Sequence, residues 1–598
     1  DAASPSSPLR EYERRLLDCT LVVEAHRQTD RRMSQWRGVT FVAAMIAVVL
    51  SSTVHWSPGW VVLVPAAGFA VLVAWHQRVL RVLRRADRSV GYYQRAIARI
   101  DDRWEGVGPT GERYLKPNHL YAADLDLFGT GSLFQLLCRA RTRVGEDRLA
   151  SWLLQASDRP TVELRQAAVR ELSPDVDLLE ELALLSGEVH EEIDQNQLRR
   201  WARGTPRPIS ATVRVAAVVL AAATVSALIG WFLGLRLTWL LASGTLMGVF
   251  LFGFRRRIRD CARAADAAAS GLLILARVLS LLEDRRFADP LLSSMRVRLE
   301  TGGLSPSQQI ARLHRFIHNL NNCLRNQFFS MFALLLALPV HLVHAIESWR
   351  SHVGSHIGDW LETIADFEAL VSFAGFSYEN PDAVFPGFSE SSPHFVAEQI
   401  GHPLLPKRLC VRNDLHFDAQ RPLMLISGSN MSGKSTLLRT VGVNAVLAQA
   451  GAPVCAKRLT LSPLQVASVM RIHDSLQDGR SFFYAALERL KALVDESRGP
   501  TPLLFLLDEI LQGTNSHDRR IGAEGVIRLL MERGNIGLVT THDLALTGIV
   551  ATLDGRAVNC HFEDDLVDGR MSFDYRLRPG VVEKSNALEL MRLMGLDV

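Results

Sequence analysis

Apolar positions follow two different patterns along this chain of 598 residues. Two long and nearly uncharged stretches, 38–77 and 212–254, lie in the N-terminal half, whereas short apolar runs alternate with helical segments across 394–598. Such alternation is typical of an α/β domain. Residues 78–211 and 255–380 are rich in Leu, Ala and Arg and have a helical period. The pattern predicts a multidomain chain with apolar helical hairpins, a helical core or lever region, and a C-terminal α/β domain.

Each nearly uncharged stretch consists of two segments close to the ~20 residues that a bilayer span needs. The first divides at Ser57-Pro58-Gly59 and the second at Arg236, and the turns carry only His55 and Arg236. Arginines flank both stretches on the opposite side: Arg31, Arg32, Arg37, Arg78, Arg81, Arg84, Arg85, Arg203, Arg207, Arg214, Arg255, Arg256 and Arg257. This asymmetry follows the positive-inside rule. It predicts two transmembrane hairpins with external tips, a multi-pass protein of the cytoplasmic membrane, and the lipid bilayer as a partner.

A fifth uncharged run, Asn326 to Ile346, contains Pro339, His341 and His344. If this run crossed the membrane, the C-terminal domain would lie on the opposite side from the arginine-rich flanks. We therefore predict a buried helix in the soluble core. The segment 1–37 is expected to be an N-terminal cytosolic helix or tail, and 381–393, rich in Pro, Gly and Ser, is expected to be a linker.

A glycine-containing loop follows the apolar run Pro422 to Ile426 and precedes the helical stretch Leu437 to Ala450. Strand, glycine loop and helix N-terminus form the setting in which backbone N–H groups surround phosphates. Lys434 is expected to reach the β- and γ-phosphates of ATP, and the Ser435 hydroxyl to bind Mg²⁺. The predicted nucleotide-binding residues are Gly428, Ser429, Asn430, Met431, Ser432, Gly433, Lys434, Ser435 and Thr436.

Acidic and imidazole side chains follow two further apolar strands. Leu503 to Leu507 ends in Asp508 and Glu509, and the next strand ends in His542. Polar residues at strand ends collect at one edge of an open α/β sheet. We expect Asp508 to contact Mg²⁺, Glu509 to polarise the attacking water, and His542 to sense the γ-phosphate.

The residues within these motifs resemble those of the MutS family of DNA mismatch-repair ATPases. In chain order, the similar segments are Gly401–Leu404, the phosphate loop, Arg480–Phe483, Asp508–Ser516, Thr540–Leu544 and Tyr575–Gly595. Three segments farther upstream resemble the opening of that family's helical core: Asp126–Leu137, Thr142–Leu153 and Arg165–Val169. Ser432 stands where the family has Gly, and Leu511-Gln512 where it has Gly-Arg. These departures suggest a divergent branch.

The resemblance implies that 394–598 is a P-loop ATPase domain of the ABC type, which uses ATP and Mg²⁺. It also implies a homodimer in which Ser481 of one subunit reaches the nucleotide of the other. The family's mismatch-reading domain has no counterpart here, and the stretch 212–254 occupies the place of its DNA-gripping clamp. The arginine excess beside the hairpins says more about lipid than about DNA.

Three functions follow from these features. The first is a membrane-anchored MutS-like ATPase that acts on DNA in mismatch repair or damage processing. The second is a motor of the same mechanism that acts on a membrane protein or lipid without touching DNA. The third is an ABC transporter subunit. It is the weakest of the three, because the Leu-Ser-Gly-Gly-Gln signature of ABC transporters is absent from the sequence. The seven scattered cysteines fit a reducing compartment.

Overall fold

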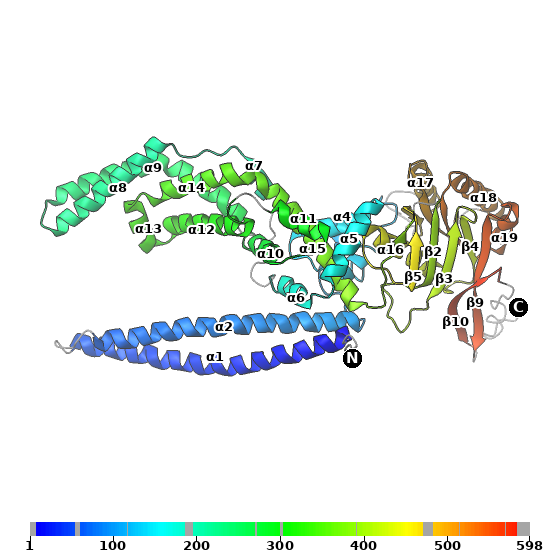
Figure 1. Ribbon diagram of the computed structural model, residues 1–598, viewed down its shortest axis with the longest axis horizontal. Coiled ribbons are helices and arrows are strands. Elements are labelled where there is room, and N and C mark those ends of the chain that lie inside the picture. The colour runs from blue at the N-terminus through cyan, green and yellow to red at the C-terminus, as the bar shows by residue number, and fades with distance from the viewer. Residues whose placement is uncertain are drawn as a thin grey trace.

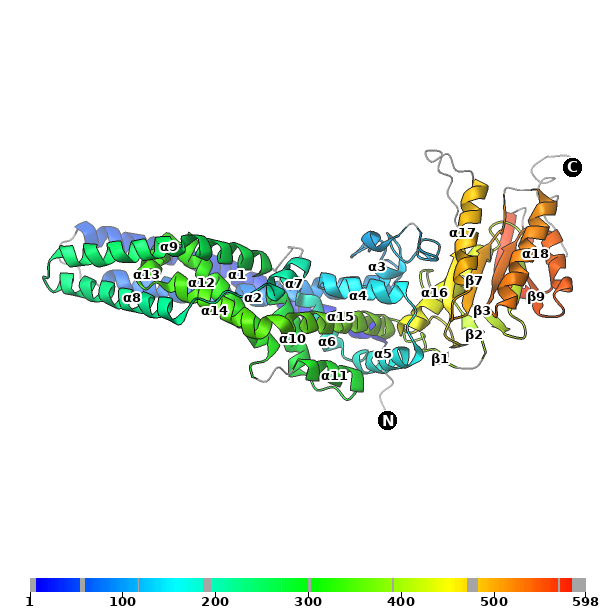
Figure 2. The ribbon, with the colours of Figure 1, turned by 90° about the horizontal axis from the view of Figure 1, so that it is seen from above.

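The computed structural model shows an elongated molecule with a helical half at one end and an α/β domain at the other (Figure 1). The same separation is visible from above (Figure 2). The structure describes residues 7–53, 60–116, 118–185, 195–269, 272–299, 303–389, 392–470, 482–512, 515–567 and 570–582.

The first hairpin consists of the two longest helices, α1 (Pro8–Thr53) and α2 (Trp60–Ile100), which pack side by side. Neither helix breaks at the expected domain boundaries near residues 38 and 77, so each apolar segment continues directly into a charged helical segment. Halfway along, His76 is buried between the helices, where its Nε2 lies 2.6 Å from Oδ1 of Asp30 and its Nδ1 lies 2.8 Å from Nη1 of Arg37.

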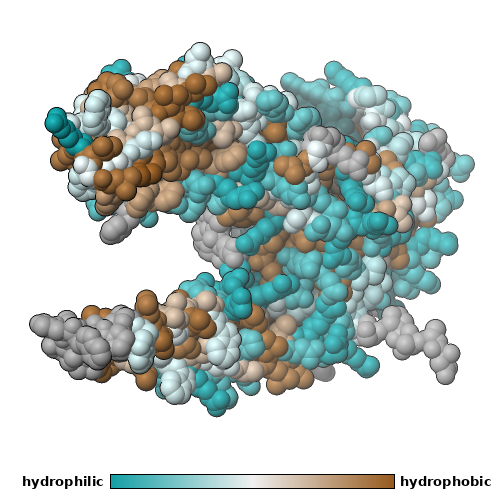
Figure 3. Space-filling view, turned by 60° about the vertical axis from the view of Figure 1, so that its left-hand side comes forward, coloured by the Kyte–Doolittle hydropathy of each residue, from teal (hydrophilic) through white to brown (hydrophobic). Residues whose placement is uncertain are grey.

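The second hairpin, α8 (Ala211–Phe232) and α9 (Leu237–Ala269), turns at Gly234, whose φ of +94° suits glycine. Three helices are long and apolar enough to cross a membrane, judged by length and composition among the described residues: Leu63–Ile100, Ala211–Phe232 and Leu237–Asp266. The described part of α1 is not among them. The tip of the second hairpin lies at the end of the molecule remote from the α/β domain, and the described parts of α1 and α2 extend toward the same end (Figures 1 and 2). Both form separate prongs with apolar surfaces (Figure 3).

Between the prongs and the α/β domain lies a core of packed helices. Its central helix is α15 (Ile357–Glu379), which is buried over most of its length and packs against α4 and α5. The other helices of this half are α3 (Leu133–Leu137), α4 (Arg143–Leu154), α5 (Arg159–Leu172), α6 (Val176–Leu184), α7 (Gln195–Arg203), α10 (Leu272–Asp284), α11 (Pro290–Arg298), α12 (Pro306–Arg325), α13 (Gln327–Leu335) and α14 (Leu338–Val353). Two 3₁₀ turns, η1 (Glu112–Tyr114) and η3 (Gly354–His356), complete it.

The run 326–346 is not the single buried helix that its composition predicted. It forms α13 and α14, which meet at a bend of 82°. Ala337 at the bend has a φ of +50°, and Pro339 occupies the first turn of α14. The prediction is right for residues 338–346 of α14, none of which is exposed, and wrong for α13, which exposes large apolar side chains.

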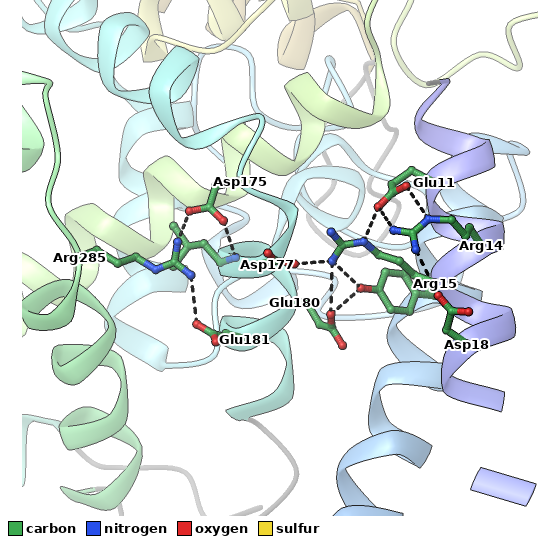
Figure 4. A network of polar contacts seen from close by, with 11 residues as sticks. Glu11, Arg14, Arg15, Asp18, Asp175, Asp177, Glu180, Glu181 and Arg285 are labelled. Atoms are coloured by element: carbon green, nitrogen blue, oxygen red, sulfur yellow. Dashed lines mark hydrogen bonds and ion pairs between the residues drawn. The ribbon is translucent and has the colours of Figure 1, made fainter. Parts of the chain in front are cut away.

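A ladder of ion pairs holds α6 between the first hairpin and the core (Figure 4). Arg15 of α1 lies 2.5 Å from Oδ1 of Asp177, and Arg285, just beyond α10, pairs with Asp175 and Glu181. These side chains are partly exposed, so each pair contributes only about 0–1 kcal/mol. Their number nevertheless fixes the orientation of α6 relative to both neighbours.

A buried ionic cluster joins the base of the first hairpin to the core. The carboxylate of Glu379, at the end of α15, accepts hydrogen bonds of 2.7 Å from both Arg99 of α2 and Arg139, and all three side chains are largely buried. Burial opposes ionisation of Glu379, but Arg139 and Arg99 hold its pKa below the ordinary value. Two residues past α2, Asp102 accepts a 3.0 Å hydrogen bond from the backbone N–H of Lys407 in the α/β domain.

The α/β domain contains two sheets. The larger has the strand order β10-β9-β4-β8-β7-β6, in which β6, β7, β8, β4 and β9 are parallel. Its strands are β4 (Leu423–Ser427), β6 (Gln465–Val469), β7 (Leu503–Asp508), β8 (Ile536–Thr541), β9 (Ala557–Val567) and β10 (Arg570–Pro579). Four helices accompany it: α16 (Lys434–Ala450), α17 (Phe482–Glu496), α18 (Ser516–Glu532) and α19 (Leu544–Thr547), with the 3₁₀ turn η4 (Gly548–Thr552) after α19.

The smaller sheet has the order β1-β5-β2-β3, with β1 (Gly387–Phe388), β2 (His394–Ile400), β3 (Asn413–Asp418) and β5 (Arg458–Leu461). Here the structure departs from the expected linker at 381–393. Val384 forms a bridge with Val454, and β1 pairs in parallel with β5. Backbone hydrogen bonds therefore make the described part of this segment an edge of the α/β domain rather than a free connection.

The helical half also docks directly on the α/β domain through Asp124, whose side chain is fully buried. Its Oδ2 accepts hydrogen bonds of 2.8 Å from both the Ser468 hydroxyl and the Arg489 guanidinium of α17. The backbone of Leu120 accepts from Ser468 N–H at 2.9 Å. This contact fixes the position of α17 relative to the core.

Candidate active site

The predicted strand, loop and helix are present as β4, residues 428–433 and α16. Gly428 and Gly433 have φ of +154° and +102°, and a Cβ on Gly428 would lie 2.8 Å from Ser432 Oγ. Only glycine fits such a curve without moving its neighbours. The hydroxyls of Ser429 and Ser432 are buried with no hydrogen-bond partner among the described residues. A glycine cradle with unsatisfied donors next to a helix N-terminus fits a phosphate group.

Lys434 places its ammonium within this loop. The side chain is buried, and Nζ donates to the carbonyl oxygens of Gly428 at 2.8 Å and Ser429 at 2.7 Å. Burial lowers the pKa of Lys434, an effect that the nearby carboxylates of Glu509 and Asp508 oppose. The Lys434 ammonium is therefore positioned to pair with the negatively charged oxygens of a phosphate group bound in the loop.

The carboxylates lie beside the loop because β4, β8 and β7 are adjacent and parallel. Asp508 ends β7, and its Oδ1 accepts a hydrogen bond from the hydroxyl of Thr540 on β8. Glu509 has a φ of +50° and donates its backbone N–H to the carbonyl of Thr540 at 3.1 Å. Oε1 of Glu509 lies 3.1 Å from Nδ1 of His542. The structure thus brings Lys434, Asp508, Glu509 and His542 to one edge of the sheet.

A magnesium ion at this edge would draw on few protein ligands. The described residues contain no group of three or more His, Cys, Asp or Glu side chains able to hold a metal. The protein ligands of Mg²⁺ would be the hydroxyl of Ser435, in the first turn of α16, and the carboxylate of Asp508. Mg²⁺ commonly completes its coordination shell with oxygens of the substrate phosphate and of water. The composition of the site fits a metal that binds together with a nucleotide.

One predicted site residue, Ser481, lies outside the described residues, and α17 begins directly after it at Phe482. Two further residues contribute, although the sequence only placed them in segments that resemble the MutS family and assigned neither a role. Thr540 orients Asp508, and the ring of Tyr575 lies so close to the loop that a Cβ on Gly433 would be 3.0 Å from its Cδ1. Tyr575 adopts a φ of +54° within a β10 irregularity. No short motif signals that geometry.

His402 marks the start of the domain in the sequence and is buried near α16. Its Nδ1 accepts a 3.2 Å hydrogen bond from the N–H of Leu404, which requires an unprotonated nitrogen. Burial, with a smaller contribution from Arg439, lowers the pKa of His402 to about 4. The imidazole is therefore neutral at physiological pH.

With this geometry in view, comparison with known proteins assigns the domain. Residues 424–597 match the family model described as MutS domain V. The C-terminal region is similar to MutS domain V over these residues, and 424–597 is called domain V below. Similar proteins include the DNA mismatch repair protein MutS of Brevibacillus brevis, 32% identical over 253 residues, which are 41% of this chain and 29% of that protein. Endonuclease MutS2 of Thermus thermophilus is 34% identical over 219 residues, 35% of this chain and 27% of that protein.

The similarity extends to eukaryotic relatives. The DNA mismatch repair protein MSH6 of Arabidopsis thaliana is 30% identical over 269 residues, 42% of this chain and 20% of that protein. The chain thus spans less than a third of the length of these relatives. The family model matches only 424–597, a range that includes neither prong.

Proposed function

We propose that this protein is a membrane-anchored ATPase that binds and hydrolyses MgATP and uses the reaction to move its helical half. The observation that carries the proposal is the meeting of the phosphate loop, Asp508, Glu509 and His542 at one edge of domain V. Phosphoryl transfer depends chiefly on positioning and on charge stabilisation. Those are the two contributions that this edge supplies.

Each residue has a role that follows from its place. Lys434 and the loop N–H groups bind the β- and γ-phosphates, and Ser435 and Asp508 hold the metal that neutralises developing charge. Glu509 accepts a proton from the attacking water, and His542 orients the Glu509 carboxylate through their 3.1 Å contact. Thr540 fixes Asp508 by donating its hydroxyl proton to the carboxylate.

We further propose that two copies close over the nucleotide, as the resemblance to the MutS family implies, with Ser481 of one subunit facing the other's ATP. The position of α17 supports this arrangement, because the helix that starts at Phe482 is anchored through Arg489 to the buried Asp124. Closure of the dimer would then pull on the helical half through an ionic contact.

The membrane anchor rests on the two prongs. Three helices pass the length and hydropathy requirement for a span, and their large apolar side chains are exposed. Solvent exposure of so much apolar surface is unfavourable in water, at about 25 cal/mol per Å². We therefore propose a protein of the cytoplasmic membrane with domain V in the cytosol and the prong tips outside.

The first test measures Mg²⁺-dependent ATP turnover by the full-length protein in lipid nanodiscs. Lys434→Ala is expected to reduce turnover to background, because the phosphates lose their loop cation. Lys491→Ala is the matched control, since it removes an exposed lysine from α17 of the same domain. Normal turnover by Lys434→Ala would overturn the assignment of the site.

The second test addresses membrane topology in intact cells. Leu233→Cys, at the exposed tip of the second prong, should react with an impermeant maleimide from outside. Leu409→Cys, exposed on the α/β domain, should react only after the cells are opened. The parental protein measures background labelling of its seven cysteines. External labelling of Leu409→Cys, or protection of Leu233→Cys, would contradict the topology.

Action on DNA is a second candidate, favoured by the names of the similar mismatch-repair proteins. The prongs favour action on the membrane instead, because apolar surfaces stand where basic DNA contacts would be needed. Binding of matched, mismatched and branched duplexes, measured at several salt concentrations, separates the two. A steep loss of affinity with salt would indicate multiple phosphate contacts and support the DNA role.

A further inference from the structure

Helix α13 carries an apolar face that no part of the described structure covers. Met331 and Phe332 are 69% and 63% exposed, and three further large apolar side chains nearby are also exposed: Phe329, Leu334 and Leu336. The opposite side is packed, since Ala333 and Ala337 are buried. No Lys, Arg, Asp or Glu occurs between Arg325 and Glu347. The helix is therefore two-sided, with one face on the protein and one apolar face outward.

The direction of α13 differs from that of its neighbours. It meets α14 at 82°, whereas α12 and α14 run roughly along the second prong (Figure 1). If the prong follows the membrane normal, α13 lies close to the membrane plane. Nine residues of helix span only about 13 Å, less than half of the ~30 Å hydrocarbon core. The helix is too short to cross and is oriented to lie flat.

The apolar face also continues an apolar surface already described. Helix α13 contacts both α8 and α9, and it lies alongside the second prong in both ribbon views (Figures 1 and 2). On α9, the side chains of Leu246 and Val249 are exposed and apolar as well. A lipid bilayer that surrounds α8 and α9 would therefore also contact α13.

We propose that α13 is an interfacial helix whose apolar face is embedded in the cytoplasmic leaflet of the bilayer beside the second prong. This inference rests on the proposed membrane anchor and adds a shallow contact that does not cross. Its polar boundary is the end of α12, where exposed Arg325 lies 2.8 Å from Asp266 of α9. Amphipathic helices of this kind bury their apolar face at the boundary of headgroups and acyl chains.

The occupant is lipid hydrocarbon rather than another protein copy, because α13 contacts α8 and α9, the two helices that the proposed anchor places in the bilayer. The attachment to α14 gives the contact a mechanical consequence. Residues 338–379 form α14, η3 and α15, which lead from α13 to Glu379 at the base of the first prong. A movement of α15 would therefore shift α13 within the leaflet in which it is embedded.

The test places an environment-sensitive fluorophore at single cysteines in the full-length protein, reconstituted in phosphatidylcholine–phosphatidylglycerol vesicles. Met331→Cys and Phe332→Cys report on α13, Leu246→Cys on the second prong, and Val297→Cys on an exposed apolar position of α11. Lipids brominated at shallow or deep acyl positions quench nearby fluorophores according to depth. Correct folding of each variant is checked by MgATP turnover equal to that of the parental protein.

We expect both α13 positions to be quenched at least twofold more by shallow than by deep bromines, Leu246→Cys to be quenched by both, and Val297→Cys by neither. Quenching at Leu246→Cys without quenching at α13 would refute the interfacial helix and leave the anchor intact. A water-excluded but unquenched fluorophore on α13 would mean that protein covers it, which also refutes the proposal. Absence of quenching at every position would refute the membrane anchor itself.

Discussion

Replacing Glu509 by Gln separates ATP binding from ATP hydrolysis in this site. The side chain is about one-quarter exposed, and its principal polar contact is the one with Nδ1 of His542. A glutamine keeps the size of the side chain and an oxygen that accepts from that ring. The backbone hydrogen bond to Thr540 is unaffected, and the φ of +50° costs the same for both side chains. The substitution therefore removes basicity and little else.

The size of the effect follows from this difference. A positioned general base contributes roughly 10²- to 10⁴-fold to the rate of a reaction. We expect turnover to fall by that factor. ATP affinity should change by less than about threefold, because Lys434, Ser435 and Asp508, to which we assign the binding contacts, remain. The free energy of unfolding should change by less than about 1 kcal/mol, since no buried group loses a partner.

Single-turnover hydrolysis and equilibrium binding of a fluorescent ATP analogue measure the two quantities on the same preparation. Glu524→Gln is the matched control, because Glu524 is a similarly exposed carboxylate of domain V that pairs with Arg528 away from the loop. The control should hydrolyse ATP normally. If Glu509→Gln loses ATP binding together with hydrolysis, or retains full turnover, the general-base role is refuted.

Three further perturbations test the surrounding structure. In urea titrations, wild type should lose about 2 kcal/mol of unfolding free energy at pH 5 relative to pH 7.5. The unfolded chain takes up a proton on His402 below about pH 6.5, whereas the folded protein does so only near pH 4, so stability falls as the pH drops between these values. His402→Asn should lose less. Glu379→Gln should destabilise by about 3–5 kcal/mol by leaving buried arginines unpaired, whereas the more exposed Glu362→Gln should cost about 0–1 kcal/mol. Gly433→Ala should weaken ATP-analogue binding at least about tenfold, and Gly525→Ala, with open space around it, should not.

Much of domain V could be predicted because its signals are local. A strand, a glycine loop and a helix follow one another within thirty residues, and the register of parallel strands then brings Asp508 and His542 to the same edge. The contribution of Thr540 was not visible, because it depends on which residue of β8 faces Asp508 of β7. The approach of Tyr575 to Gly433 depends on a strand irregularity that composition does not encode.

The helical half was harder to predict for a different reason. An uncharged run has the same composition whether protein or lipid surrounds it, so 326–346 gave no sign that its first half would remain exposed. The bend lies at Ala337, which is buried and has a φ of +50°, at a position where the sequence has no glycine to signal it. Similarly, the segment 381–393 has a linker's composition, yet pairing with β5 draws it into a sheet.

The ionic cluster at Glu379 is a pivot point for the first prong, because it joins the base of α2 to the helical core. Helix α2 and helix α15 both end at this cluster, and the neighbouring Asp102 accepts a hydrogen bond from the backbone N–H of Lys407 in the α/β domain. From this fulcrum α2 extends over 41 residues, or about 60 Å. A rotation of α2 by about 5° about this cluster would displace the far end of the helix by roughly 5 Å, because displacement grows with distance from the pivot point. Small rearrangements around a phosphate loop can in this way become motions as large as a helical turn at the tips.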